Sequence, residues 1–225
     1  MFGSNDLYHA LRDESVCQKY GYDTATIACM FVPNTYDLYW NISVDKFLER
    51  MKKESDKFWN FERTEKAKAM KLTPVEIITL ASIVDEETAN NGEKPMIAGM
   101  YYNRLMLRNA EYPEGMPLQA DPTIKYAWQR FDLKRIYNNL LSIKSPYNTY
   151  KNPGLPPGPI RIPSVAGIDA SSTMCITITS TCVPRRISAA LIILPALTMS
   201  TCRMQPNILR HSTKEVSSKI RKQER

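Results

Sequence analysis

Histidine and cysteine are scarce in this chain of 225 residues, which contains two histidines and five cysteines. No two cysteines have the C-x-x-C spacing of a zinc site, and an odd, scattered set is not typical of a disulfide framework. Neither His9 nor His211 lies in a recognisable motif, which disfavours a catalytic triad that depends on histidine. The sequence therefore predicts a protein that uses no metal and no cofactor.

Long apolar runs are also missing. The longest, residues 189–197, is about half of the roughly 20 residues that a membrane helix needs. The N-terminus lacks the basic and then apolar order of a signal peptide, so we expect neither an anchor nor an export signal in the chain as written. A charged fraction of 24% and a mean hydropathy of -0.36 are typical of a soluble globular protein.

The last 55 residues lack glycine, aspartate and aromatic side chains altogether. They also carry the whole net charge of +7, because residues 1–170 hold 21 basic and 21 acidic side chains whereas residues 171–225 hold nine and two. Single-stranded nucleic acids bind where basic residues alternate with aromatic ones, and this basic segment has no aromatics. The composition therefore predicts no nucleic-acid partner and a change of character at about residue 170.

Before that point the pattern predicts an α+β fold in two parts. Residues 1–42 read as a small lead-in, with a helix over residues 5–20 and a strand over residues 25–40 that is broken at Pro33. Residues 43–170 read as a helix-rich domain. Its expected helices cover residues 43–70, begin again at residue 73, cover residues 93–108, and continue as short pieces near residues 123–128 and 133–141.

Two local signals are specific. Thr73, Pro74 and Glu76 combine a helix cap, a proline at the first helical position and a capping box, which predicts a sharp helix start. Residues 145–163 contain six prolines and two glycines, and this composition predicts no regular element. Such a long loop must be held by side chains or serve to bind a ligand.

Three consecutive acids, Asp85, Glu86 and Glu87, follow an apolar helical stretch, and they point about 100° apart. Leu80, Val84 and Glu87 share one face, so we expect only Glu87 to point toward the core. Apolar surroundings raise the pKa of a carboxyl group, and a carboxyl group that keeps its proton can act as a general acid. The spacing alone leaves open that Glu87 is a helix-end carboxylate bonded to a neighbouring arginine or amide.

The segments LASIVDEET, GMYYNRL, MPLQADPT, SPYNTYKNPGLPPGPI and IPSVAGIDA follow one another in this order. Over roughly residues 25–170 the chain resembles the endolytic murein transglycosylase family, also called MltG or YceG-like. The resemblance implies a LysM-like subdomain over residues 1–42, of which only part is present, and a YceG-like catalytic domain over residues 43–170. It also implies an inner-membrane anchor with a periplasmic catalytic domain in the full-length family.

The resemblance further implies an enzyme that cuts the MurNAc-GlcNAc bond of nascent peptidoglycan glycan strands, leaves 1,6-anhydro-N-acetylmuramic acid ends and so limits strand length. Peptidoglycan synthases are expected partners. Its catalytic glutamate falls on Glu87, and Asp85 is a conservative departure from the family pattern. One carboxyl group suffices for such a reaction, whereas ordinary glycosidases need two.

Substrate-binding groups are expected around this glutamate. Each has a structural alternative: Asp121 as a helix cap, Asn148 as a stitch within the loop, the glycines as turn formers, and Asn103 and Arg104 as residues that face only the loop. The expected substrate-binding residues are Asn103, Arg104, Gln119, Asp121, Tyr147, Asn148, Tyr150, Gly154, Pro156, Pro157 and Gly158. An inactive fragment or a non-catalytic glycan-binding module would keep the loop without needing Glu87, and this alternative also stays open.

The tail departs from the family. When each codon's third base is joined to the first two bases of the next from Thr173 onward, synonymous codons permit NVYHDHLYMCAKEDFSGTHNFARTYDEHL and a stop at residues 218–219. This shifted reading recovers aromatic, glycine and aspartate residues in the family's order. We therefore interpret residues 171–225 as an aberrant basic tail that is translated out of frame.

If the tail is out of frame, proteases should cut the chain as written after about residue 170, because residues 187–199 form an uncharged apolar run that no selection has fitted to a core. Restoring the shifted frame should give a soluble chain that resists cleavage there. Limited proteolysis of both chains, read by mass spectrometry, measures the difference. A tail as resistant as the body in the unshifted chain would contradict the interpretation.

Overall fold

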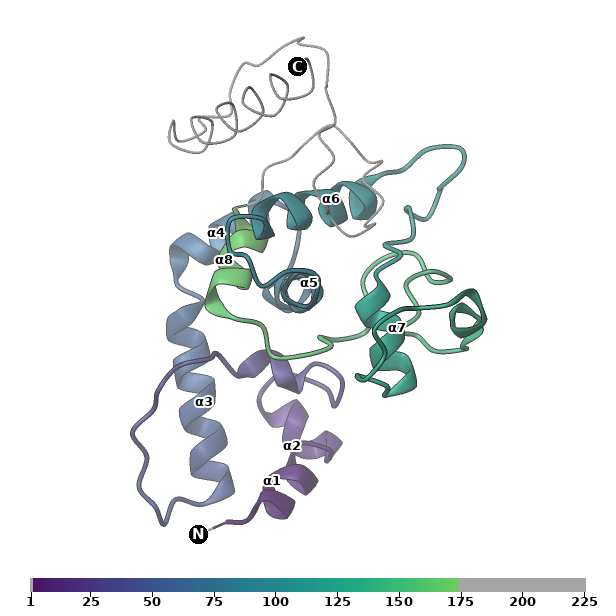
Figure 1. Ribbon diagram of the computed structural model, residues 1–225. Coiled ribbons are helices and arrows are strands. Elements are labelled where there is room, and N and C mark those ends of the chain that lie inside the picture. Colours follow the sequence, from purple (N-terminus) through teal and green to yellow (C-terminus); the bar gives the residue numbers. More distant parts are fainter. Residues whose placement is uncertain (1, 174–225) are drawn as a thin grey trace, which may run out of the picture. The chain divides into compact units, whose positions relative to one another are not determined.

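The computed structural model describes residues 2–173, and these belong to one compact unit, Met1–Pro184 (Figure 1). A second unit, Arg185–Arg225, lies outside the described residues, as does nearly all of the expected out-of-frame tail. The helices of the described part are α1 (Ser4–Ala10), α2 (Glu14–Lys19), η1 (Ile27–Met30), α3 (Val44–Phe58), α4 (Phe61–Ala69), α5 (Pro74–Glu87), α6 (Lys94–Met106), α7 (Asp121–Trp128), η2 (Asn138–Ser142) and α8 (Val165–Ser172).

The β part of the expected α+β fold is wrong for the described residues, which contain helices and loops and no strand. Where a strand was expected, the Asp23 carboxylate accepts the backbone N–H groups of Ala25 and Thr26 at 2.8 and 2.7 Å. These bonds turn the chain into the 3-10 helix η1, and Pro33 lacks the N–H group that a strand ladder would use. The LysM-like subdomain is not confirmed.

Two of the expected helices are divided by side chains that cap a new helix. Asp13 accepts the N–H group of Ser15 and starts α2, and Asn60 accepts the N–H group of Arg63 and starts α4. Asn and Asp compete for backbone hydrogen bonds in this way and so favour helix starts over helix interiors. The helix start at Thr73 is confirmed, with both bonds of the capping box present.

Helix α5 lies at the centre of the fold. All eight residues from Ile77 to Val84 are buried, and the helix contacts η1, α4, α6, α7 and α8. Figure 1 shows α5 nearly end-on, with α4, α6 and α8 close around it. A helix that is apolar on all sides must be covered on all sides, so the other helices gather around this one.

The proline-rich loop is held against α5 and the N-terminal segment. The Ser82 hydroxyl on α5 accepts the N–H group of Ile160 at 3.1 Å. Gly158 meets the backbone of Ala25 so closely that a Cβ atom there would lie 2.2 Å from the Ala25 carbonyl oxygen. Only glycine fits that approach, and the loop is thus fixed at both contacts.

A buried ion pair joins α5, α6 and the start of α8, a helix that the sequence patterns did not predict. The Lys94 ammonium lies 2.9 Å from the Asp85 carboxylate, with side-chain exposures of 6% and 5%. Asp85 also accepts the Ser164 N–H group at 2.6 Å, and Lys94 donates to the Ser164 hydroxyl at 3.2 Å. Gly167 leaves room for this carboxylate, because a Cβ atom there would lie 2.3 Å from it.

Lys94→Met should lower the free energy of unfolding by about 3–5 kcal/mol, because it leaves the Asp85 carboxylate buried without its countercharge. Replacing both partners, Asp85→Leu with Lys94→Met, should cost less than the single change plus the loss at Asp85. Urea denaturation measures both. Lys66→Met on α4 is the matched control, since its pair with Glu62 is exposed and should change stability by less than about 1 kcal/mol. Equal losses at Lys94 and Lys66 would contradict the role of the buried pair.

Candidate active site

Glu87 ends α5 and points into the protein toward α6. Its carboxylate accepts a hydrogen bond from the Tyr101 hydroxyl at 2.6 Å, and Tyr101 is fully buried. The bonded neighbour is thus a tyrosine, not the arginine or amide that the sequence left open. A short bond from a buried donor fixes the orientation of the carboxyl group.

The pKa of the Glu87 carboxyl is raised above its ordinary value, and burial is the main cause. The Tyr101 hydrogen bond acts in the opposite direction and lowers it. The negative charge of Asp121 raises the pKa further, while the positive charges of Lys125 and Arg104 lower it. The rise outweighs the decrease, so the group keeps its proton at a higher pH than a free glutamate.

A second carboxylate and tyrosine form a parallel pair beside the first. The Tyr150 hydroxyl donates to Asp121 at 2.5 Å, and burial together with this bond raises the Tyr150 pKa. Asp121 is the first residue of α7, whose cap is Ala120, so Asp121 does not cap the helix. The negative charge of Glu87 also raises the Tyr150 pKa, which places the two pairs within electrostatic reach of each other.

The other two acids have separate roles. Glu86 is exposed and forms an ion pair with Arg161 at 2.6 Å. Asp85 is buried in the ion pair with Lys94. The expectation that only Glu87 points inward is therefore wrong, because the start of α8 covers a further side of α5 and buries Asp85 there.

Arg104 belongs to the same buried region as Glu87. It is 2% exposed, donates to the Leu118 carbonyl at 2.5 Å, and its charge lowers the pKa of both Glu87 and Tyr150. Asn103, its neighbour on α6, is half-buried. Gln119 has an exposed side chain and a left-handed backbone with φ 55°, and its N–H group donates to the Thr149 carbonyl at 3.0 Å.

The predicted loop residues mainly hold the loop itself. The fully buried Asn148 donates to the Leu141 and Ile143 carbonyls and accepts the Tyr150 N–H group, so it stitches the backbone. Tyr147 packs on Tyr126 with ring centroids 4.6 Å apart, and burial raises its pKa to about 12.

The prolines and glycines of this loop differ in position. Gly154 has φ 88°, a turn conformation that favours glycine. Pro156 and Gly158 are buried, whereas Pro157 is exposed. Of the predicted site residues, the structure brings Glu87, Arg104, Asp121 and Tyr150 within electrostatic reach of one another.

Tyr101 and Lys125 were missed as site residues. The apolar spacing of α6 correctly assigned Tyr101 to the core, but burial of its ring says nothing about the partner of its hydroxyl. The available signal was chemical: a buried tyrosine needs a hydrogen-bond acceptor, and the carboxylate that ends the preceding helix supplies one.

The YceG-like family model matches residues 3–174, which is most of the chain. The chain belongs to the YceG-like family. The match begins just inside the N-terminus and ends within one residue of the last described residue. All the YceG-like residues of the site lie inside it.

Relatives of this YceG-like chain include an endolytic murein transglycosylase from Bacillus subtilis (strain 168), 36% identical over 118 residues, which are 52% of this chain and 30% of that protein. Another from Streptococcus pneumoniae (strain ATCC BAA-255 / R6) is 35% identical over 143 residues, 62% of this chain and 24% of that protein. A crystal structure of a YceG-like protein from Listeria monocytogenes has a TM-score of 0.61 at 27% identity, over 77% of this chain and 59% of that one. The chain thus spans under a third of these curated relatives.

Two searches of the described residues returned nothing. Within residues 2–173, no helix is both long enough and apolar enough to cross a membrane. The same part of the chain contains no cluster of three or more His, Cys, Asp or Glu side chains that could hold a metal ion.

Tyr101→Phe should raise the pKa of Glu87, because it removes the hydrogen bond that stabilises the carboxylate. Asp121→Asn should lower it, because it removes a nearby negative charge. Carbon-detected NMR of the glutamate carboxyl groups across a pH titration measures both shifts, with Glu87→Gln used to assign the signal. Glu86→Gln is the control and should leave the Glu87 titration in place. Shifts of the same sign in the two variants would contradict this account of the site.

Proposed function

We propose that this chain is a lytic transglycosylase that cuts the MurNAc-GlcNAc β-1,4 bond within peptidoglycan glycan strands, with Glu87 as its single catalytic acid. The observation that carries the proposal is the buried Glu87 carboxyl, held by Tyr101 and with a raised pKa. Relatives named as endolytic murein transglycosylases support the substrate class.

In the first step the protonated Glu87 gives its proton to the glycosidic oxygen, the bond from C1 to that oxygen breaks, and positive charge develops on the muramyl ring. In the second step the Glu87 carboxylate accepts the proton of the same sugar's 6-hydroxyl while that oxygen bonds to C1. The product is a 1,6-anhydro end. The acid recovers its proton and no water is consumed, so atoms and charges balance.

The neighbours of Glu87 fit both halves of this cycle. Burial favours the protonated acid that the first step needs, and the Tyr101 hydrogen bond steadies the carboxylate between the steps. The Asp121 carboxylate, oriented by Tyr150, supplies negative charge near the ring that becomes positive. Asn103, Arg104 and Gln119 belong to the substrate-binding part of this proposal, as do the loop residues that shape the wall: Tyr147, Asn148, Gly154, Pro156, Pro157 and Gly158.

A hydrolase would need a second carboxylate as base or nucleophile, and Asp121 is the one available beside Glu87. Hydrolysis would leave reducing ends, whereas transglycosylation leaves anhydro ends. The two reactions are therefore separated by the mass of the product, which differs by one water.

The wider setting follows from family membership as part of the same proposal. Residues 43–170 form the catalytic domain, the full-length protein acts at the outer side of a bacterial inner membrane, and peptidoglycan synthases are its partners. Cleavage within nascent strands would then limit their length. Residues 171–225 contribute nothing to this activity if they are read out of frame.

Glu87→Gln should abolish release of anhydromuropeptides from purified glycan strands, a loss of at least about 100-fold, because the amide keeps the shape of the acid but has no proton to give. Chromatography with mass detection measures the products. Glu86→Gln is the matched control, since Glu86 is exposed, lies one residue away and pairs with Arg161. Turnover by Glu87→Gln close to that of the unaltered chain would exclude Glu87 as the acid.

A further inference from the structure

One face of α7 runs from the candidate active site to an exposed indole ring. Asp121, Lys125 and Trp128 stand at positions i, i+4 and i+7 of this helix and so share a face. The charges of Asp121 and Lys125 both act on the Glu87 carboxyl, which places this face beside the site. Trp128 lies one turn further along it.

Trp128 is held in place although much of it is exposed. Its ring is 42% exposed, and its Nε1–H group donates to the Leu140 carbonyl in η2 at 3.0 Å. The helix ends here, with Gln129 in the left-handed conformation, so the chain beyond turns away from the helix axis. A flat apolar ring that is already fixed costs little ordering entropy when a ligand covers it.

Other aromatic rings continue from α7. Tyr126 contacts Phe131 edge-on, with ring centroids 6.4 Å apart, and Phe131 is 65% exposed. Tyr126 also packs on Tyr147 of the proline-rich loop. This end of α7 thus presents two exposed rings that are braced by the same loop that borders the site.

We propose that Trp128 is the stacking platform of a second glycan subsite, which holds the strand at a distance from the bond that is cut. This inference rests on the proposed function. The C–H groups on one face of a sugar ring pack on the π face of an indole while the hydroxyl groups at the edge remain in water. Lys125, between Asp121 and Trp128 on the same face, fits the carboxylate that each muramic acid carries.

The spacing makes this subsite dependent on strand length. Seven helical steps separate Asp121 from Trp128, or roughly 10 Å along the axis. The sugar that undergoes cleavage at Glu87 cannot also lie on Trp128, so a strand must span that distance to reach both. Affinity should therefore rise in a step when the strand becomes long enough.

The experiment measures binding of glycan strands of one, two and more disaccharide repeats by calorimetry, in the full chain carrying Glu87→Gln to prevent turnover. With Trp128 present, affinity should show a step with length; in Trp128→Leu this step, about three- to tenfold, should be lost. Leucine keeps apolar volume but offers no flat ring, and Trp128→Phe, which keeps a ring, should retain most of the step.

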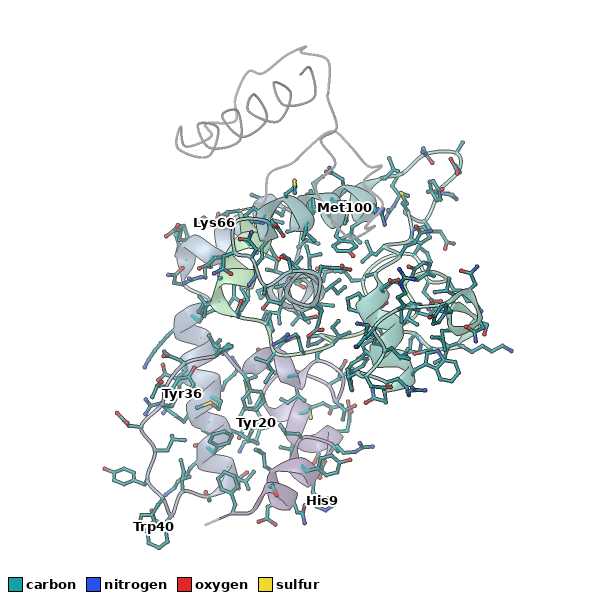
Figure 2. All side chains as sticks on the ribbon, in the orientation of Figure 1. His9, Tyr20, Tyr36, Trp40, Lys66 and Met100 are labelled. Atoms are coloured by element: carbon teal, nitrogen blue, oxygen red, sulfur yellow. The ribbon has the colours of Figure 1, made fainter. Side chains whose placement is uncertain are left out.

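Trp40→Ala is the matched control, because Trp40 is 76% exposed and lies on a loop far from α7 (Figure 2). It should leave the step unchanged. The same length dependence with and without the Trp128 ring would overturn the subsite. Failure of strands of every length to bind would instead overturn the proposed function. Thermal melting of each variant identifies an unfolded chain, and in that case the result for Trp128→Phe decides.

Discussion

The rest of the structure depends on the complete burial of one helix. Eight consecutive residues of α5 have no access to water, so every side of the helix must be covered by another part of the chain. Helices α4, α6, α7 and α8 supply that cover, and the Ser82 hydroxyl fixes the proline-rich loop to it. The candidate site forms where this helix ends, because a terminal residue is the first that can carry a carboxylate among apolar neighbours and still reach a ligand.

The three acids at that end show how surroundings assign chemistry to identical functional groups. Asp85 is neutralised by a buried lysine, Glu86 lies at the surface with an arginine, and Glu87 has a tyrosine hydroxyl and little water. Of the three carboxyl groups, only that of Glu87 lacks a direct ion-pair partner among the described residues while being largely buried. Proton transfer needs this combination, since a carboxylate in a close ion pair holds its charge too firmly to act as an acid.

Sequence reasoning succeeded where one local signal decides the outcome. The capping box at Thr73 predicted the start of α5, and the spacing of Leu80 and Val84 predicted the inward direction of Glu87. It failed where distant residues decide. The strand expected over residues 25–40 had the right composition but no partner strand in the described part of the chain, and Asp85 is buried by a helix that begins 80 residues later. The link from Tyr101 to Glu87 joins two helices, and neither pattern contains it.

The contact between Gly158 and Ala25 bears on how the lead-in and the catalytic domain are related. A loop beside the site rests, backbone against backbone, on a segment from the first 42 residues. The lead-in therefore acts as a structural wall of the enzyme and is more than a tether to whatever precedes it. A fragment that began at residue 43 would keep every predicted site residue and still lose the surface that sets the position of the loop.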